Sequence, residues 1–269
     1  MLSGARAVCV LGVHRSGTSA VTRALELGGV YLGEPEDLFA GPDNPEGHRE
    51  RLDVMQLHDR LLAALGRRWS TERPLDPGWI ADPAVAPFRA ELFALVERAF
   101  AGRALWGFKD PRACQLLPLW RQVLDALGVR LEVVMPVRHP IDVSRSIEAR
   151  NALGRGTGLA IWTNGVLSGL CAARGLRVAR VSFDRFRAEP AEHLRRLAGL
   201  LELAAPGAAV ESAVRAAVHP GPAGSEREAA PEALESLHRA LATDWPALTS
   251  PALFSLAERR LDEFARRGV

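Results

Sequence analysis

The segment Gly12–Ser19, with the sequence GVHRSGTS, constrains the fold of this chain more than any other. It follows a short apolar, β-rich run over Ala5–Leu11 and precedes a helical pattern over Thr18–Leu27, which Gly28 and Gly29 end. A buried strand, a glycine-containing loop and a helix in direct succession are the context of phosphate-binding loops of the form GxxxxGK(S/T). The spacing therefore predicts an anion-binding loop between a strand and a helix.

Thr18 occupies the position at which such loops carry a lysine. Because that ammonium steadies the β- and γ-phosphates of a nucleotide, its replacement disfavours a triphosphate. The loop is still expected to hold one 5′-phosphate through the amides of Arg15–Ser19, at the positive end of the helix dipole. The alternative is an ordinary strand-to-helix turn capped by Thr18 or Ser19. The residues expected to bind the phosphate are His14, Arg15, Ser16, Gly17, Thr18 and Ser19.

Lys109 is the second informative feature. Of the 34 lysines and arginines it is the only lysine, so 33 are arginines, in a chain rich in Ala, Gly and Pro. Where arginine replaces lysine so widely, a retained lysine indicates a place that needs a compact ammonium rather than a planar guanidinium. The alternative is chance retention on a solvated face. Its position after the apolar run Ala104–Phe108, in the segment Lys109–Arg112 (KDPR), favours a chemical role.

Strands alternate with helices along the chain, which predicts an α/β fold. We expect a parallel sheet flanked by helices, similar to P-loop NTPases, with an almost wholly helical part from Pro190 onwards. A single domain over residues 1–269 is expected, with a core over 5–200 and a helical extension over 201–269. Ligands of such sheets lie beyond the carboxyl ends of the strands. The predicted strands are Ala5–Leu11, Ala104–Phe108, Leu131–Val137 and Arg177–Phe183.

Composition excludes several classes of function. The net charge is only +2 and the isoelectric point about 8.7, so no global field favours nucleic acid or a membrane surface. No apolar run approaches the roughly 20 residues of a membrane span. Three widely spaced cysteines without a CxxC pair indicate a reducing compartment, and seven histidines without an HxxxH or HExxH pair predict no zinc site. A cytoplasmic protein without metal is expected.

Arg138 and Ser146 form a second pair with a possible anion-binding role. Arg138 ends the predicted third strand, and Ser146 lies eight residues later, about two turns into the next helix. From these positions an arginine and a serine can hold a phosphate from two sides. A plain helix cap with a surface arginine is the alternative. Arg138 is nevertheless expected at the same edge of the sheet as the loop and Lys109, because each of the three follows a predicted strand.

Together these motifs resemble the sulfotransferases that use 3′-phosphoadenosine 5′-phosphosulfate (PAPS). Val10–Ser19 is similar to the family's 5′-phosphosulfate loop, and Val134–Ser146 to its 3′-phosphate motif. Phe108–Pro111 is similar to the Lys-Asp-Pro element of the tyrosyl-protein branch. Asp43–Glu50 and Trp106–Arg112 resemble bacterial members associated with modification of sugars or natural products. The resemblance covers roughly residues 5–200.

The resemblance implies a donor, PAPS, with 3′,5′-ADP (PAP) as the product and no metal. The sulfuryl group would pass to a hydroxyl of a small molecule, glycan or natural product. Lys109 and Arg15 would stabilise charge on the bridging and sulfuryl oxygens, and a carboxylate of the loop after the first helix would act as general base. Glu50 is the first choice and Glu34 the second. The remaining candidates are Glu36, Glu46 and His48.

Other interpretations stay open at this point. A P-loop-type kinase would need an acidic Mg²⁺ ligand, for which Asp110 is the candidate, and a catalytically inactive nucleotide-binding protein would need neither. Arg112 is either a further anion ligand or the partner of a carboxylate. The acceptor, the residue that stacks on adenine and the oligomeric state are not determined. Most of four tryptophans are expected in the core: Trp79, Trp106, Trp120 and Trp162.

Overall fold

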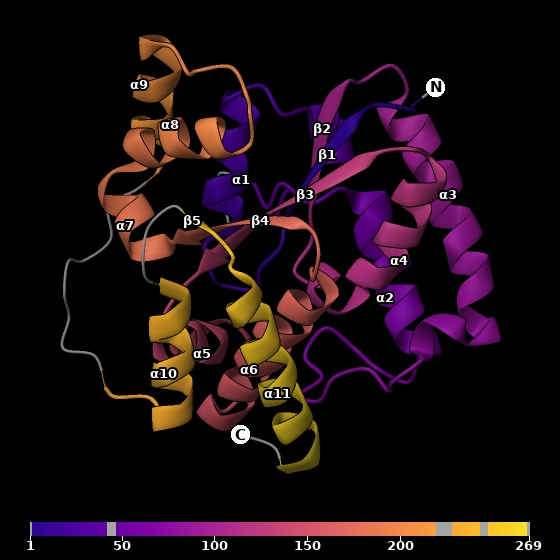
Figure 1. The fold of residues 1–269 in the computed structure, drawn as a ribbon, viewed down its shortest axis with the longest axis vertical. Coiled ribbons are helices and arrows are strands. Elements are labelled where there is room, and N and C mark those ends of the chain that lie inside the picture. The colour runs from indigo at the N-terminus through magenta and orange to yellow at the C-terminus, as the bar shows by residue number, and fades with distance from the viewer. Residues whose placement is uncertain (1, 42–46, 219–227, 243–246, 268–269) are drawn as a thin grey trace.

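A central sheet organises the computed structural model, which describes residues 2–41, 47–218, 228–242 and 247–267. In this part of the chain five strands pair in the order β2-β1-β3-β4-β5 (Figure 1). The pairs among β1 to β4 are parallel, whereas β5 runs antiparallel to β4. The strands are β1 (Arg6–Val10), β2 (Leu105–Lys109), β3 (Arg130–Val137), β4 (Arg177–Ser182) and β5 (Ala247–Leu248).

Helices cover both faces of the sheet, as the alternation of strands and helices predicts. Side chains of β1 alternate between the two layers: Val8 and Val10 pack with α1, α8 and α9, while Ala7 and Cys9 face the larger layer. The first layer contains α1 (Thr18–Leu27), α8 (Pro190–Leu200) and α9 (Ala208–Ala217). The larger one contains α2 (Leu52–Ala64), α3 (Ala86–Phe100), α4 (Ala113–Ala126), α6 (Arg155–Ala172) and α11 (Pro251–Arg267).

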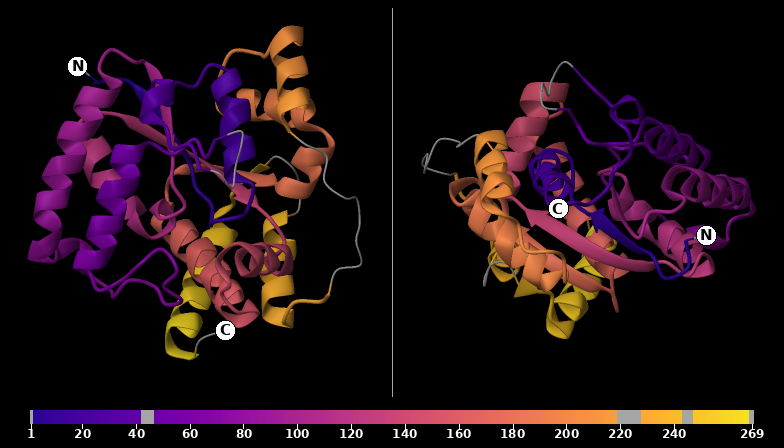
Figure 2. Two further views of the ribbon diagram at one scale, coloured as in Figure 1. Left: turned by 180° about the vertical axis from the view of Figure 1, so that it is seen from behind. Right: turned by 90° about the horizontal axis from the view of Figure 1, so that it is seen from above.

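Three further helices complete the described chain. They are α5 (Pro140–Asn151), α7 (Phe183–Ala188) and α10 (Glu232–Ala242). Short 3-10 turns occur at Pro35–Asp37, Trp79–Ala81 and Pro83–Val85. Seen from behind, α8 and α9 again lie beside α1, on the opposite side of the sheet from α10 and α11 (Figure 2).

The predicted α/β class, the four parallel strands and the strand-loop-helix unit are confirmed. Helix α1 has the predicted bounds, and Gly28 is its C-cap. The part after Pro190 is almost wholly helical in the described residues, as predicted, but Ala247–Leu248 form the short strand β5, which pairs with β4. A strand of two residues is too short to produce an alternating pattern, so its pairing was decided by tertiary contact.

The parallel register places the ends of three strands side by side. Val10 of β1 is the partner of both Lys109 of β2 and Val134 of β3. The loop after β1, Lys109 and the segment after β3 therefore leave the sheet at the same edge, where ligands of parallel sheets bind.

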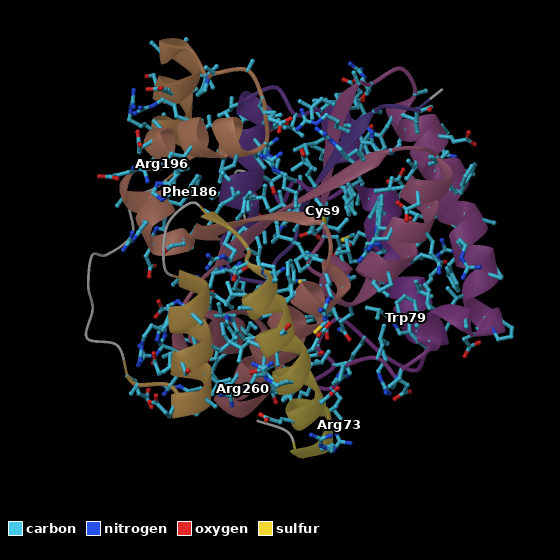
Figure 3. The ribbon with its side chains drawn as sticks, viewed as in Figure 1. Cys9, Arg73, Trp79, Phe186, Arg196 and Arg260 are labelled. Atoms are coloured by element: carbon cyan, nitrogen blue, oxygen red, sulfur yellow. The ribbon has the colours of Figure 1, made fainter. Side chains whose placement is uncertain are left out.

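The three cysteines are free thiols. Cys9 and Cys114 are buried, and Cys171 is half-buried. Figure 3 shows Cys9 near the centre of the molecule, whereas Arg196 and Arg260 lie at its periphery. Burial raises the pKa of the Cys9 thiol well above its ordinary value, followed by smaller contributions from Cys114 and Asp110. Among the described residues, no helix has the combination of length and apolar character that crossing a bilayer requires.

Candidate active site

A cavity of about 370 Å³ opens at the carboxyl edge of the sheet. Its wall is built by the loop after β1, the first turn of α1, the end of β2, and residues following β3 and β4. Eight of the residues predicted for the site line it: His14, Arg15, Gly17, Thr18, Ser19, Glu50, Lys109 and Arg138. The structure therefore brings together, in one cavity, residues that lie far apart in the sequence.

The loop after β1 has the shape of an anion cradle. Ser16 Oγ donates to Val13 O at 2.7 Å, which ties the loop back on itself. Gly17, the N-cap of α1, has φ 88°, and a Cβ there would lie 2.0 Å from Cδ2 of Phe183, so only glycine fits. No side chain caps this helix and no acidic residue occupies its first turn, and Thr18 and Ser19 of that turn line the cavity. The alternative of a turn capped by Thr18 or Ser19 is not observed.

Arg15, Arg138 and Ser146 meet beside this loop. Arg15 Nε donates to Ser146 Oγ at 2.8 Å, and Arg138 Nη1 donates to Arg15 O at 2.9 Å. Arg15 has a left-handed backbone, φ 67°, which is uncommon for a residue with a side chain. Trp162 Nε1 donates to Arg138 O at 3.0 Å and holds the chain at the end of β3. The two predicted phosphate-binding segments are thus in direct contact.

Lys109 is buried at the floor of the cavity. Its ammonium donates to Glu50 Oε1 at 2.6 Å, to His48 O at 2.8 Å and to Ser19 Oγ at 3.2 Å. The side chain of Lys109 is 2% exposed and that of Glu50 is 7% exposed. All three N–H bonds of the ammonium have an acceptor, and the pair is held between α1 and the chain leading into α2. Lys109 is therefore a buried cation with three hydrogen-bond acceptors and not a surface residue.

Asp110 and Arg112, which follow Lys109 in the sequence, belong to a network of hydrogen bonds and ion pairs. Arg112 makes a bidentate contact with Asp59, at 2.6 and 3.0 Å, and donates to Asp110 Oδ1 at 3.0 Å. Trp120 Nε1 donates to His58 Nε2 at 2.8 Å, so the proton of the ring is on Nδ1, which donates to Asp110 Oδ2 at 3.0 Å. Arg112 is therefore the partner of carboxylates, which resolves the open choice about its role.

Two of the other general-base candidates, Glu34 and Glu36, lie outside the cavity. Glu34 is exposed and accepts hydrogen bonds from Tyr31 at 3.1 Å and Arg103 at 3.5 Å. Glu36 is also exposed and, like Glu34, does not line the cavity. Glu46 lies outside the described residues. His48 lines the cavity, but its ring stacks on Phe39 with 5.0 Å between ring centroids. Glu50 is thus the described carboxylate that faces the cavity.

The cavity is strongly cationic. Its lining includes one carboxylate, Glu50, and six cationic side chains: Arg15, Arg23, Lys109, Arg138, Arg150 and Arg187. Burial lowers the pKa of Arg138. Asp142 and Asp184 oppose this shift, whereas the neighbouring cations Arg187 and Arg15 add to it. Arg138 Nε is buried and has no hydrogen-bond partner among the described residues. An anion bound here would relieve both penalties.

Some residues of the site were missed by sequence reasoning. Phe183, predicted only as the end of a strand, packs on Gly17, and the centroid of its ring lies 5.5 Å from Cζ of Arg138. Arg150 and Arg187 carry no motif, and only their position on α5 and α7 brings them to the cavity. Trp106, Trp120 and Trp162 are fully buried, as expected of core residues.

The burial of His14 is expected to make the stability of the folded protein depend on pH. Its ring packs edge-on against Trp69, with 4.7 Å between centroids, and Nε2 is buried without a partner among the described residues. Burial, then the charge of Arg112, lowers its pKa from 6.5 to about 3. The unfolded chain therefore binds a proton at His14 below about pH 6.5 that the folded protein does not bind. The stabilising contribution is complete above pH 6.5 and is lost as pH falls toward 3.

We expect the free energy of unfolding to fall by up to about 1.4 kcal/mol per pH unit between pH 6 and pH 4 because of His14. Urea unfolding of the protein and of His14→Gln at pH 7, 6, 5 and 4 measures this slope. The variant is expected to lose stability less steeply. Equal slopes would show that His14 titrates alike in the folded and unfolded states.

Comparison with protein-family models gives no match, and comparison with curated proteins gives none either. Three solved structures are similar over nearly the whole chain. The sulfotransferase domain of the Synechococcus PCC 7002 olefin synthase is 16% identical with a TM-score of 0.47, over 96% of this chain and 94% of that one. The sulfotransferase domain from the curacin biosynthetic pathway is 16% identical with a TM-score of 0.45, over 97% and 98%. A sulfotransferase from Alicyclobacillus acidocaldarius is 14% identical with a TM-score of 0.41, over 97% and 96%.

All three structures are sulfotransferases or sulfotransferase domains, the family that the sequence motifs resemble. Identities and TM-scores of this size do not by themselves establish what this chain binds or which reaction it catalyses.

Proposed function

We propose that this protein transfers the sulfuryl group of PAPS to a hydroxyl of a small-molecule or carbohydrate acceptor. The observation that carries the proposal is the buried pair of Lys109 and Glu50, 2.6 Å apart, in a cavity that also contains Arg15 and Arg138. A cation for the leaving group, a carboxylate for the acceptor proton and arginines for phosphates are the parts that such a transfer needs.

The charge and the shape of the cavity support PAPS as the donor. The cradle around Gly17 offers backbone amides for one phosphate, and its sequence lacks the lysine that a triphosphate requires. Arg138 Nε has no hydrogen-bond partner among the described residues, and Arg15 links Arg138 to Ser146 because it accepts from Arg138 and donates to Ser146. This arrangement suits a second, separate phosphate. We assign the 5′-phosphosulfate to the loop and the 3′-phosphate to Arg138 and Ser146.

In the proposed reaction the acceptor oxygen bonds to sulfur as the bond between sulfur and the bridging oxygen breaks. Glu50 takes the proton of the acceptor hydroxyl. Lys109 and Arg15 stabilise the negative charge that remains on the departing phosphate oxygen and spreads over the sulfuryl oxygens. To reach the donor, Lys109 must exchange one of its three bonds to Glu50, Ser19 and His48. Release from Lys109 would also leave Glu50 able to accept a proton.

The surroundings of Asp110 argue against the kinase alternative. Both of its oxygens are engaged, Oδ1 by Arg112 and Oδ2 by His58, and its side chain is fully buried. Burial raises the pKa of this carboxyl, but Arg112 and His58 outweigh it and hold the pKa well below its ordinary value. A carboxylate used in this way cannot also coordinate Mg²⁺ in the cavity without dismantling the network.

Calorimetric titration with PAP, and separately with ATP plus Mg²⁺, tests the proposal. We expect PAP to bind in the presence of EDTA and to bind more tightly than Mg-ATP. Preference for Mg-ATP would support a kinase, and failure to bind either nucleotide would support neither enzyme. Transfer of labelled sulfate from PAPS to a panel of alcohols and sugars then identifies the acceptor.

Arg138→Ala is expected to weaken PAP binding by about 2 kcal/mol, roughly 30-fold, because a charged hydrogen-bond partner of the 3′-phosphate is lost. Binding of 5′-AMP, which lacks that phosphate, should change little in the same variant. Isothermal titration of both nucleotides against both proteins measures the difference. An equal loss for the two nucleotides would show that Arg138 does not recognise the 3′-phosphate.

A further inference from the structure

We propose that His139, Glu235 and His238 form a binding site for a transition-metal cation, with Zn²⁺ preferred. One nitrogen or carboxylate oxygen from each residue lies within 4.8 Å of the corresponding atoms of the other two. His139 precedes α5, and the other two residues belong to α10. None of the three lines the cavity described above, so this proposal stands independently of the proposed function.

The fold holds the three side chains in place. Glu235 and His238 are three residues apart on α10 and therefore share one face of the helix. The helix is anchored because Leu234 and Leu237 are buried, and because Arg180 of β4 donates to the carbonyl of Leu241 at 2.6 Å. A site of this kind needs ligands on rigid elements, and α10 and the start of α5 supply them.

The start of α5 fixes His139. Its Nδ1 accepts a hydrogen bond from the backbone amide of Ile141 at 3.3 Å, and the ring is buried. The preceding residue, Arg138, is turned to the cavity, where it donates to Arg15 O. The His139 ring instead contacts α10: its Nε2 donates to Glu235 Oε1 at 2.9 Å, and its centroid lies 4.9 Å from that of His238.

The donor set suits zinc. Two imidazoles and one carboxylate, with water as a fourth ligand, are a common tetrahedral arrangement for Zn²⁺. With metal-ligand distances of about 2.0–2.1 Å, the ligand atoms must lie about 3.3 Å apart. The bonded pair of His139 and Glu235, 2.9 Å apart, is close to that spacing, and the ligand atom of His238 lies within 4.8 Å of the other two, so His238 must move closer when the ion binds.

Coordination changes one proton position. His139 Nε2 now carries the ring proton, because Nδ1 accepts from Ile141. When Nε2 binds the metal, this proton moves to Nδ1 and the long contact with Ile141 is given up. The bound ion would then connect α10 to His139, the N-cap residue of α5.

Titration of the full-length, tag-free protein with Zn²⁺ after treatment with EDTA tests the proposal. We expect one Zn²⁺ per chain and a rise in Tm that EDTA reverses. His238→Ala and Glu235→Gln should each weaken Zn²⁺ binding by roughly 100-fold. A loss of about 100-fold is the upper end of what is seen when the substituted residue only hydrogen-bonds to a metal ligand. Co²⁺ in place of Zn²⁺ should give visible absorption bands that disappear in both variants.

Two controls separate a metal site from a structural contact. Glu235→Gln keeps an oxygen that accepts from His139, so its Tm in EDTA should stay close to that of the unmodified protein while the rise with Zn²⁺ is lost. Glu232→Gln, an exposed change on the same helix, should bind Zn²⁺ normally. The proposal is overturned if the protein binds no stoichiometric Zn²⁺ at millimolar concentration, or if Glu235→Gln and His238→Ala bind it as tightly as Glu232→Gln does.

Discussion

Replacement of Lys109 by alanine is expected to lower kcat by about 10²–10³-fold, the cost of removing one group that stabilises transition-state charge. Binding of PAP should change by only a few-fold, because the product lacks the sulfuryl group and the loop and Arg138 hold its phosphates. Turnover with labelled PAPS and calorimetry with PAP measure the two quantities separately.

The reason for this expectation is the position of the ammonium. Lys109 is buried with three acceptors, and the nearest other cation to Glu50 is Arg112, with 3.8 Å between Nη1 and Oε2. Alanine therefore leaves the buried Glu50 carboxylate with only the longer contact to Arg112, which costs stability as well as rate. The double variant Lys109→Ala/Glu50→Gln removes that charge, and the comparison of its kcat with that of Glu50→Gln alone isolates the contribution of Lys109 from the loss of stability.

Lys109→Arg is the matched variant for the argument that a compact ammonium is needed. It retains the charge, but a planar guanidinium cannot reproduce the three contacts at 2.6, 2.8 and 3.2 Å around one nitrogen. We expect this variant to bind PAP and to remain well below the unmodified protein in kcat. An unchanged kcat in Lys109→Ala would remove this residue from the mechanism.

Glu50→Gln is expected to lower kcat by about 10²–10⁴-fold, the usual contribution of a positioned general base. Glutamine has nearly the same size and still offers an oxygen to Lys109, but it cannot take the acceptor proton. Donor binding should be retained, because the carboxylate repels the phosphates rather than holding them. Initial rates at saturating PAPS, together with PAP titration, measure this separation.

Glu34→Gln is the control for the general base. Glu34 was the second candidate from the sequence, but it is exposed and accepts from Tyr31 and Arg103 outside the cavity. We expect this change to leave kcat within about two-fold, as for most exposed substitutions. If Glu34→Gln is inactive while Glu50→Gln retains its rate, the assignment of the base is wrong.

Much of the fold could be predicted because its signals are local. The apolar run before Gly12, the glycines at 12 and 17, and the helix that Gly28 ends are each encoded within about ten residues. Parallel strands then place their carboxyl ends at one edge by geometry alone. That rule is why Lys109 and Arg138, 29 residues apart, could be expected near the loop.

Long-range partners could not be predicted in the same way. The contacts between His58 and Asp110, and between Phe183 and Gly17, join segments whose spacing carries no periodic signal. The pairing of β5 and the meeting of His139 with α10 have the same character. Each depends on how helices pack on the sheet, which is decided by the whole core rather than by a window of sequence.

The sequence by itself determined the class of the fold and the loop between β1 and α1, and it singled out Lys109 as the one lysine of the chain, because residue type and short-range spacing are sufficient for these. Only the tertiary structure decided which of several carboxylates meets Lys109 and which charge Arg112 neutralises. Glu50 and Lys109 are 59 positions apart, and their contact follows from the path by which the chain returns from α1 to α2. A buried ammonium must be satisfied by whatever acceptors that path delivers, so its partner is a property of packing.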